Sequence, residues 1–408
     1  MSDTLTADRV MKCSNWLRQV EASPTVSLSA RAMELRAAGH DVINLAAGEP
    51  DFDTPDYIRD AAHEAIRAGH THYTPASGIP ALRTAIAARM TRRTGYTFAA
   101  ENIAITAGTK LAVYLSLAAL LEPDDEVLVP APYWVSYPAM VNMVGGKPCR
   151  VWAGPEQGFK VSVEDLQAAR TIRTRGLIFN SPSNPTGADY TEAEMRAIAG
   201  WAATNNIWII SDEIYAPLRF SETPYTSILS LDPRGLDGVL INDGFSKSHA
   251  MTGWRLGFVA ATKELTSGII RVLGQTTSNA ASISQYAALA AATGPDDEVQ
   301  RMCRAFKSRR DAMYDQLKNI PGLGCNLPDG AFYFFLDVTN FMGRKTEQGE
   351  IIHTSEDLCA HLLAHKHVAL VPGEGFGAPG FLRLSYATDI DTLNSAVSRL
   401  SDGLGSLH

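Results

Sequence analysis

Short apolar runs alternate with helical patterns over about residues 100 to 260, and this alternation constrains the fold more than any other feature. "NIAITAG" (102–108) is typical of a strand, "TKLAVYLSLAALL" (109–121) of a helix, and "DEVLVPAP" (125–132) of another strand. Further strands are predicted in "GLIFNSP", "IWIISDEIY", "GVLINDG" and "LGFVAAT", with the helical "TEAEMRAIAGWAATN" between the first two. Such alternation predicts an α/β fold with a mostly parallel sheet covered by helices on both faces.

The remainder of the chain has a different pattern. From about residue 298, "EVQRMCRAFKSRRDAMYDQLKNI" predicts a long amphipathic helix. A mixed region follows, with the apolar "AFYFFLDV", a helix near 355–366, and "FLRLSYA". A length of 408 residues is enough for two domains. We therefore predict a large domain over 55–295 and a smaller α/β domain formed by 1–54, which includes an N-terminal arm, and 296–408.

Composition excludes several classes of protein. Lys and Arg number 36 against 44 Asp and Glu, a net charge of -8, so no general electrostatic attraction to nucleic acid or anionic membrane is expected. The amino terminus lacks the apolar core of a signal peptide, and no run of about 18 apolar residues occurs. Five widely spaced cysteines without a CxxC pair, and an "HLLAH" without the glutamate of HExxH, predict neither a disulfide framework nor a metal site. We expect a cytoplasmic protein.

Candidate ligand-binding side chains follow the predicted strands. In a parallel sheet, ligands bind at the carboxyl ends of the strands. The residues found there are a helix start at Gly108, Thr109 and Lys110, the aromatic Trp134, Asn184, the pair Asp212 and Tyr215, and Lys247. These positions combine a phosphate-type helix terminus, an aromatic ring, an amide, a carboxylate with a phenol, and an amine.

The stretch "DGFSKSHAMTGWRLGF" (243–258) holds Lys247 and Arg255 among small and apolar residues, where burying an unpaired cation is costly. Pyridoxal phosphate uses the whole set of groups: an amine for its aldehyde, a carboxylate for its ring nitrogen, a flat face for the ring and donors for its phosphate. The helix beginning at "GTK" and the Arg255 guanidinium both suit a phosphate. Bound to the aldehyde and close to Arg255, Lys247 would have a lowered pKa.

Seven motifs occur in order: "LAAGEPDFDTP", "YTPASGIPALR", "PAPYWVSYP", "SPSNPTG", "SDEIY", "FSKSHAMTGWRLGF" and "RLSYAT". Over about residues 20 to 400, the chain resembles the fold-type I pyridoxal-phosphate aminotransferases of class I/II, in the bacterial aspartate aminotransferase-like branch. The resemblance implies that Lys247 would bind pyridoxal 5'-phosphate covalently and carry the proton. Asp212 would keep the ring nitrogen protonated, Tyr215 and Asn184 would bond the phenolic oxygen, and Trp134 would stack on the ring.

The resemblance also implies a phosphate site shared between two subunits. Gly108, Thr109 and Lys110 would lie at the phosphate-binding helix start, together with Arg255. Tyr73, in "HTHYTP", matches a tyrosine that reaches the partner's phosphate, which implies a homodimer with shared active sites. Some members have a phosphate-binding serine at the position of Gly244, and Ser246 is the candidate to substitute for it here.

For the substrate, the resemblance implies that Arg383 would grip the α-carboxylate through two parallel bonds. Gly48 would let the backbone approach the substrate closely, beside Trp134 and Asn184. The animal-type enzymes use a partner arginine for the side-chain carboxylate, and "GQTTSNAASISQ" contains none. In the bacterial branch a lysine at the position of Lys110 can take that role, which suggests dicarboxylic substrates such as aspartate and glutamate.

The predicted function is an aminotransferase that moves an amino group from an L-amino acid, with aspartate favoured, to a 2-oxo acid, with 2-oxoglutarate favoured. It would work by a ping-pong mechanism through pyridoxal and pyridoxamine phosphates. Another donor (prephenate, aromatic or specialised amino acids) and a β-eliminating lyase on the same fold stay open. A transcriptional regulator with an aminotransferase-like module is disfavoured, because it needs a DNA-binding segment of several tens of residues and about 20 precede the matching region.

Overall fold

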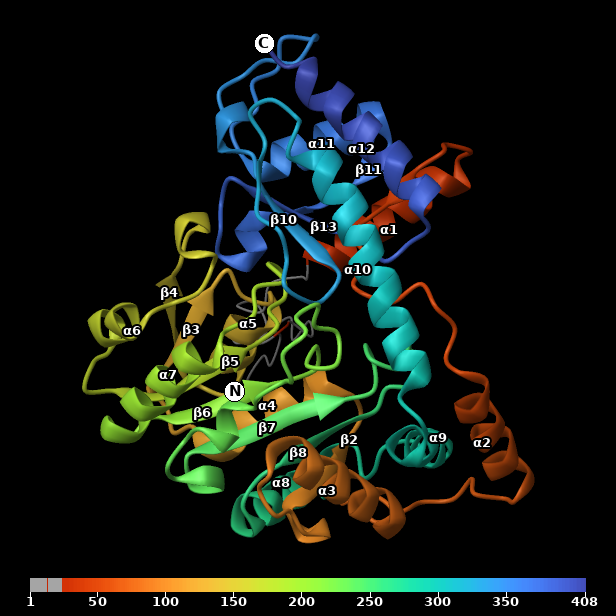
Figure 1. Cartoon of the computed structure of the whole chain (residues 1–408), viewed down its shortest axis with the longest axis vertical. Coiled ribbons are helices and arrows are strands. Elements are labelled where there is room, and N and C mark those ends of the chain that lie inside the picture. The colour runs from red at the N-terminus through yellow and green to blue at the C-terminus, as the bar shows by residue number, and fades with distance from the viewer. Residues whose placement is uncertain (1–12, 14–23) are drawn as a thin grey trace, which may run out of the picture.

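The computed structural model describes Cys13 and residues 24–408, and a seven-stranded sheet forms its centre (Figure 1). The strand order is β2-β8-β7-β6-β5-β3-β4. Neighbouring strands are parallel except where β8 pairs with β2 and with β7. The strands are β2 (Ile103–Thr106), β3 (Glu126–Ala131), β4 (Lys147–Trp152), β5 (Thr174–Asn180), β6 (Trp208–Asp212), β7 (Val239–Gly244) and β8 (Gly257–Ala260).

Helices cover both faces of this sheet because successive strand residues point to opposite sides. Ile209 belongs to the core on one face and Ile210 to the core on the other. The first core contains residues of α2 (Asp56–Arg67), α3 (Pro80–Thr94), α6 (Val163–Ala169), α7 (Glu192–Thr204) and α9 (Ser282–Thr293). The second contains residues of α4 (Thr109–Leu120), α5 (Ser136–Met143) and α8 (Lys263–Thr276). The predicted fold class is confirmed.

A second, smaller sheet is formed by strands from the rest of the chain, and it lies above the large sheet in Figure 1. Its strand order is β12-β13-β10-β9, and a separate short pair joins β1 to β11. The domain boundaries at 54/55 and 295/296 stay a prediction. The strands are β1 (Ile43–Asn44), β9 (Gly324–Cys325), β10 (Tyr333–Asp337), β11 (Val368–Ala369), β12 (Val371–Pro372) and β13 (Phe381–Ser385), and the helices are α1 (Pro24–Ala37), α10 (Asp297–Leu317), α11 (Ser355–Lys366) and α12 (Ile390–Gly405).

Several elements of the structure are absent from the sequence-based assignment, and β4 and α12 are two of them. β4 is an edge strand whose side chains are mostly exposed or half-buried, so it has no apolar run to reveal it. α12 did carry a signal, because its buried residues recur at helical spacing. They are Leu393, Ala396, Val397, Leu400 and Leu404.

The reversed direction of β8 decides where Arg255 lies. β7 ends at Gly244 and the antiparallel β8 begins at Gly257, so the loop 245–256 stays at one edge of the sheet. That edge is also where the parallel β5 and β6 end. Lys247 and Arg255 are therefore carried by one loop at the carboxyl edge, although Arg255 precedes a strand instead of following one.

A buried ionic cluster lies beside this edge. Arg93, in the last turn of α3, donates to Glu213 at 2.7 Å and to Asp243 at 2.6 Å. Both carboxylates are buried, and Ser227 and Ser211 also donate to Glu213. Glu213 follows β6 and Asp243 lies in β7, so Arg93 ties two neighbouring strand ends to one helix.

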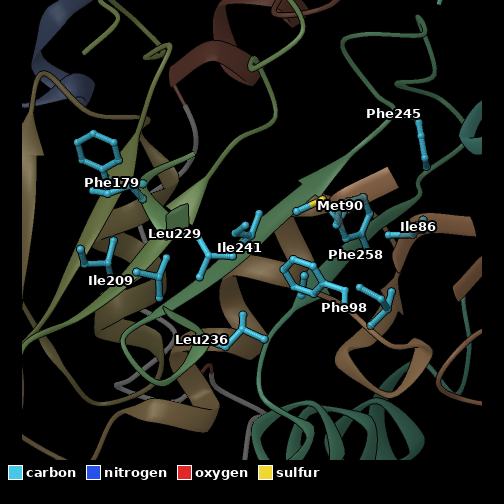
Figure 2. Packing of buried hydrophobic residues seen from close by; sticks show 14 of the residues in the cluster. Ile86, Met90, Phe98, Phe179, Ile209, Leu229, Leu236, Ile241, Phe245 and Phe258 are labelled. Atoms are coloured by element: carbon cyan, nitrogen blue, oxygen red, sulfur yellow. The ribbon is translucent and has the colours of Figure 1, made fainter. Parts of the chain in front are cut away.

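Apolar packing holds the same helix on the sheet. Ile86 and Met90 of α3 belong to one core with Ile241 of β7 and Phe258 of β8 (Figure 2). All four side chains are nearly inaccessible to solvent. The end of α3 that carries Arg93 is thus positioned by a close-packed interior, where adding or removing even one methylene group affects the packing.

Replacing Arg93 with Ala should lower the free energy of unfolding by about 3–5 kcal/mol, because two buried carboxylates lose their counter-charge. Urea unfolding of the two proteins measures the difference. Arg196→Ala is the matched control: its i,i+4 pair with Glu192 is exposed, so it should cost less than about 0.5 kcal/mol. Equal urea midpoints for the two variants would show that the Arg93 cluster does not stabilise the fold.

Candidate active site

A cavity of about 590 Å³ opens at the carboxyl edge of the large sheet and reaches the smaller sheet. Side chains from both parts of the chain line it, because β13 and β10 face the ends of β6 and β7. All of the predicted site residues except Gly108 and Tyr73 line this cavity. They are Gly48, Thr109, Lys110, Trp134, Asn184, Asp212, Tyr215, Ser246, Lys247, Arg255 and Arg383.

The Lys247 amine lies on the wall of the cavity, in the loop after β7. Its Nζ donates to the Gly48 carbonyl oxygen at 2.5 Å. Burial lowers the pKa of Lys247 to about 8, and the nearby cations Arg383 and Arg255 act in the same direction. Burial is the main cause, so Arg255 accounts for less of this shift than the sequence suggested. An amine with this pKa is partly uncharged near neutral pH and can act as a nucleophile.

Asp212 ends β6 and is 3% exposed. Burial raises the pKa of Asp212 to about 6, whereas hydrogen bonds to the carboxylate oppose this shift. Tyr137 donates its hydroxyl to Oδ2 at 2.7 Å, and the backbone N–H of Ile214 donates to Oδ1 at 3.3 Å. A buried carboxylate held in this way would be stabilised by a positively charged nitrogen in the cavity.

Arg383, in β13, is 2% exposed and buries a cation, and none of its hydrogen-bond partners in the described part of the chain is a carboxylate. Its Nη1 donates to the Asn184 side-chain oxygen at 3.0 Å and its Nη2 to the Ala46 carbonyl at 2.8 Å. The Nε atom has no partner among the described residues. Isolated buried charges are strongly disfavoured. Arg383 is therefore suited to bind an anion that enters the cavity.

The start of α4 forms another corner suited to an anion. Gly108 caps the helix with φ 90°, and Thr109 and Lys110 in its first turn line the cavity. A Cβ on Gly108 would lie 2.6 Å from Nη2 of Arg255, so the guanidinium packs directly against the cap. The free N–H groups and the positive dipole end of α4 therefore lie beside the Arg255 guanidinium.

The segment 244–256 holds three positions that the sequence singled out. Arg255 lines the cavity and is exposed, although its neighbours in the sequence are small and apolar. Gly244 departs from the serine of some relatives for a steric reason. A Cβ there would lie 2.8 Å from Thr109 Oγ1 and 3.0 Å from the Leu256 carbonyl. Ser246, the predicted substitute, lines the cavity.

Tyr73 lies outside the cavity of its own chain and is 91% exposed. It was predicted to reach the phosphate of a partner subunit, and that role stays a prediction. Trp134 lines the cavity and contacts Tyr137 edge-to-face, with ring centroids 5.3 Å apart. Lys110 places its Nζ 5.0 Å from the centre of the Trp134 ring.

Sequence reasoning missed several residues that line the cavity: Tyr137, Asn180, Tyr333, Glu49 and Thr252. Glu49 accepts a hydrogen bond from Thr252 at 2.8 Å, which joins two loops beside the cavity. Tyr137 belongs to the motif "PAPYWVSYP" and Asn180 to the predicted strand "GLIFNSP", so their positions near strand ends offered a signal. Tyr333 is hidden in the apolar run "AFYFFLDV", where a buried tyrosine looks like core packing.

A buried amine of lowered pKa lines one cavity with a buried carboxylate and with an arginine that has no carboxylate partner among the described residues. This set of groups equips an enzyme for covalent chemistry on amino or carbonyl compounds. The family "Aminotransferase class I and II" matches residues 40–400. The chain belongs to this family, and it is an aminotransferase.

Particular relatives are similar over nearly the whole chain. An aspartate aminotransferase of Geobacillus stearothermophilus is 43% identical, with 96% of this chain and 98% of that protein aligned. An aspartate/prephenate aminotransferase of Cereibacter sphaeroides is also 43% identical, over 95% and 97%. The solved aspartate aminotransferase from Rhizobium meliloti superposes with a TM-score of 0.93 at 36% identity, over 98% and 100%. That from Thermus thermophilus with maleate gives 0.90 at 37%, over 97% and 100%.

No helix in the part of the chain that the structure describes has the length and apolar character needed to span a bilayer.

Lys247 should react with an amine-directed reagent with a pH midpoint of about 8, because only the uncharged amine is nucleophilic. Reactivity rises as pH increases through the midpoint and levels off above it. Mass spectrometry of the Lys247 peptide after brief labelling of protein stripped of any bound aldehyde measures this curve. A midpoint near 10.4, the ordinary value for lysine, would contradict the effect of burial described above.

Proposed function

We propose that this aminotransferase uses pyridoxal 5'-phosphate to move the amino group of L-aspartate to 2-oxoglutarate. The observation that carries the proposal is Arg383. It is a buried guanidinium that lacks a carboxylate partner, and it faces the cavity that also contains the Lys247 amine. A substrate with a carboxylate beside its amino group would satisfy Arg383 and bring the reacting carbon toward Lys247.

The residues of the cavity fit the cofactor group by group. Lys247 offers an amine to the aldehyde, and Asp212 offers a buried carboxylate to the ring nitrogen. The first turn of α4, with Ser246 and Arg255, offers donors to the phosphate. Trp134 offers a flat face, while Tyr215 and Asn184 offer hydrogen-bonding groups to the phenolic oxygen.

When bound, the cofactor would supply an electron sink for the carbon that bears the amino group. Asp212 would stabilise the positive ring nitrogen, because its carboxylate is already held by Tyr137 and Ile214. Lys247, with a pKa of about 8, would accept a proton from the substrate and return it at a neighbouring position. Arg383 would hold the α-carboxylate so that the reacting bond is correctly oriented.

The charges around the cavity favour a substrate with a second carboxylate. Four cations line it, Lys110, Lys247, Arg255 and Arg383, against the carboxylates Glu49 and Asp212. Burial and then Arg255 lower the pKa of Lys110, so the charged form of this amine would be favoured by an anion beside it. We propose Lys110 as the contact for the side-chain carboxylate. The solved relative from Thermus thermophilus with maleate, a dicarboxylate, supports a substrate with two carboxylates.

The purified protein with added pyridoxal phosphate should show a visible absorption band that L-aspartate bleaches and 2-oxoglutarate restores. Lys247→Ala should lose the lysine-dependent band and at least 10³-fold in rate, because the covalent anchor and proton carrier are one residue. The matched control is Lys147→Ala, since Lys147 is an exposed lysine paired with Asp124. This variant should behave like the parent protein.

Other outcomes separate the alternatives. A band that aspartate leaves unchanged would retire the aspartate assignment and require a panel of donors. A relative is named aspartate/prephenate aminotransferase. Prephenate was grouped above with the donors, but it is a 2-oxo acid without an amino group, so it is the first alternative acceptor to test beside 2-oxoglutarate. Release of ammonia without transfer to an oxo acid would indicate a β-eliminating lyase. No band in the parent protein would overturn the cofactor proposal.

Lys110→Gln should lower kcat/KM for aspartate by about 100-fold, because one charge-assisted hydrogen bond to the side-chain carboxylate is worth about 2–3 kcal/mol. The value for alanine as donor should change less than about threefold, since alanine has no such carboxylate. Steady-state kinetics with the two donors measures the ratio. Equal losses for both donors would place Lys110 at the cofactor phosphate and not at the substrate.

We also propose a homodimer in which the exposed Tyr73 contributes to the partner's phosphate site. Its 91% exposure in the single chain supports a contact that another subunit would bury. The cytoplasm is the proposed location, supported by the five cysteines, all of which carry free thiols as expected for a reducing compartment.

A further inference from the structure

Tyr333 lines the active-site cavity from the small sheet, in the middle of the apolar strand β10. Its side chain is completely buried, and its hydroxyl lies 2.9 Å from the hydroxyl of Tyr215. Tyr215 comes from the segment after β6, 118 residues earlier in the chain. The hydrogen bond between the two phenols therefore links the small sheet to the segment after β6 at the wall of the cavity.

Only one of the two hydroxyl protons can take part in the hydrogen bond between Tyr333 and Tyr215. Each phenol carries a single O–H, so one donates and the other must point its proton elsewhere. Burial raises the pKa of Tyr215 well above its usual value and also raises that of Tyr333, so both hydroxyls stay protonated. A buried donor without an acceptor is costly, so the favoured arrangement is the one in which both protons find an acceptor.

The surroundings of Tyr333 favour one direction. The Arg383 guanidinium lies over the Tyr333 ring, with its carbon 4.5 Å from the ring centre, and it has donors only. A Cβ on Gly48 would approach the Tyr333 hydroxyl to 3.0 Å, so Gly48 leaves room for this oxygen. Among the described residues, the Tyr215 oxygen is the one recorded hydrogen-bond partner of the Tyr333 hydroxyl. Tyr333 is therefore best placed to donate to Tyr215.

We propose that Tyr333 is a positioning residue whose hydroxyl donates to Tyr215 and thereby aims the Tyr215 proton at an anionic oxygen bound in the cavity. This role rests on the proposed function, in which that oxygen is the phenolic oxygen of pyridoxal phosphate. A donor that is itself a hydrogen-bond acceptor is polarised and becomes stronger. In this arrangement Tyr333 acts on the bound oxygen through Tyr215.

The test is the apparent pKa of the visible cofactor band in the parent protein and in Tyr333→Phe. As pH rises, the bound cofactor loses a proton and is left with an unbalanced negative charge on its phenolic oxygen. A donor at that oxygen favours the deprotonated form, so weakening it raises the apparent pKa. We expect Tyr333→Phe to raise it by about 0.5 units and Tyr215→Phe to raise it more.

A double-variant comparison shows whether Tyr333 acts through Tyr215. In the Tyr215→Phe background, Tyr333→Phe should cause no further shift, because the group it positions is gone. Tyr386→Phe is the matched control: Tyr386 is equally buried and contacts Phe334 of the same strand, but it does not line the cavity. It should leave the apparent pKa unchanged.

Two results would overturn the inference. One is an unchanged band pKa in Tyr333→Phe that binds cofactor normally, which would make the tyrosine a packing residue. The other is an equal shift in both backgrounds, which would show that Tyr333 acts without Tyr215. Failure of the parent protein to form the band would instead overturn the proposed cofactor, and the role of Tyr333 with it.

Discussion

The parallel register of β5, β6 and β7 is the constraint on which the site depends. Asn180, Asp212 and Asn242 lie opposite one another across the three strands. Because the side chains of a strand alternate between the two faces, a slip of one residue would turn Asp212 away from the cavity. The buried cluster of Arg93, Glu213 and Asp243 joins two of these strand ends, so the interior of the fold and the geometry of the site share one set of contacts.

Burial acts on the two main titrating groups of the site in opposite directions. It raises the pKa of Asp212 to about 6 and lowers that of Lys247 to about 8, since both shifts favour the uncharged form. The two values lie on either side of neutral pH. A ligand that brings a positive nitrogen to the carboxylate and a reactive carbonyl to the amine would therefore meet groups whose protonation can change at little cost.

Excess positive charge defines what the cavity can accept. Arg383 is buried without a carboxylate partner, and Lys110 and Arg255 lie at another part of the wall. These cations are far enough along the chain from one another that only the fold brings them together. The same arrangement accounts for three anionic groups in the proposed complex, which are the cofactor phosphate and the two carboxylates of aspartate.

The sequence by itself determined the class of fold, most of the strands that build the large sheet and most of the residues at their carboxyl ends. It could do so because apolar periodicity is local and because residues such as Asn184, Asp212 and Lys247 directly follow apolar runs. Several features were decided only by the tertiary structure. The antiparallel β8 leaves Arg255 exposed beside Lys247, and Tyr333 meets Tyr215 across 118 residues. The physical reason is that strand direction, burial and pairing between distant side chains depend on contacts between segments far apart in the chain, which no local pattern records.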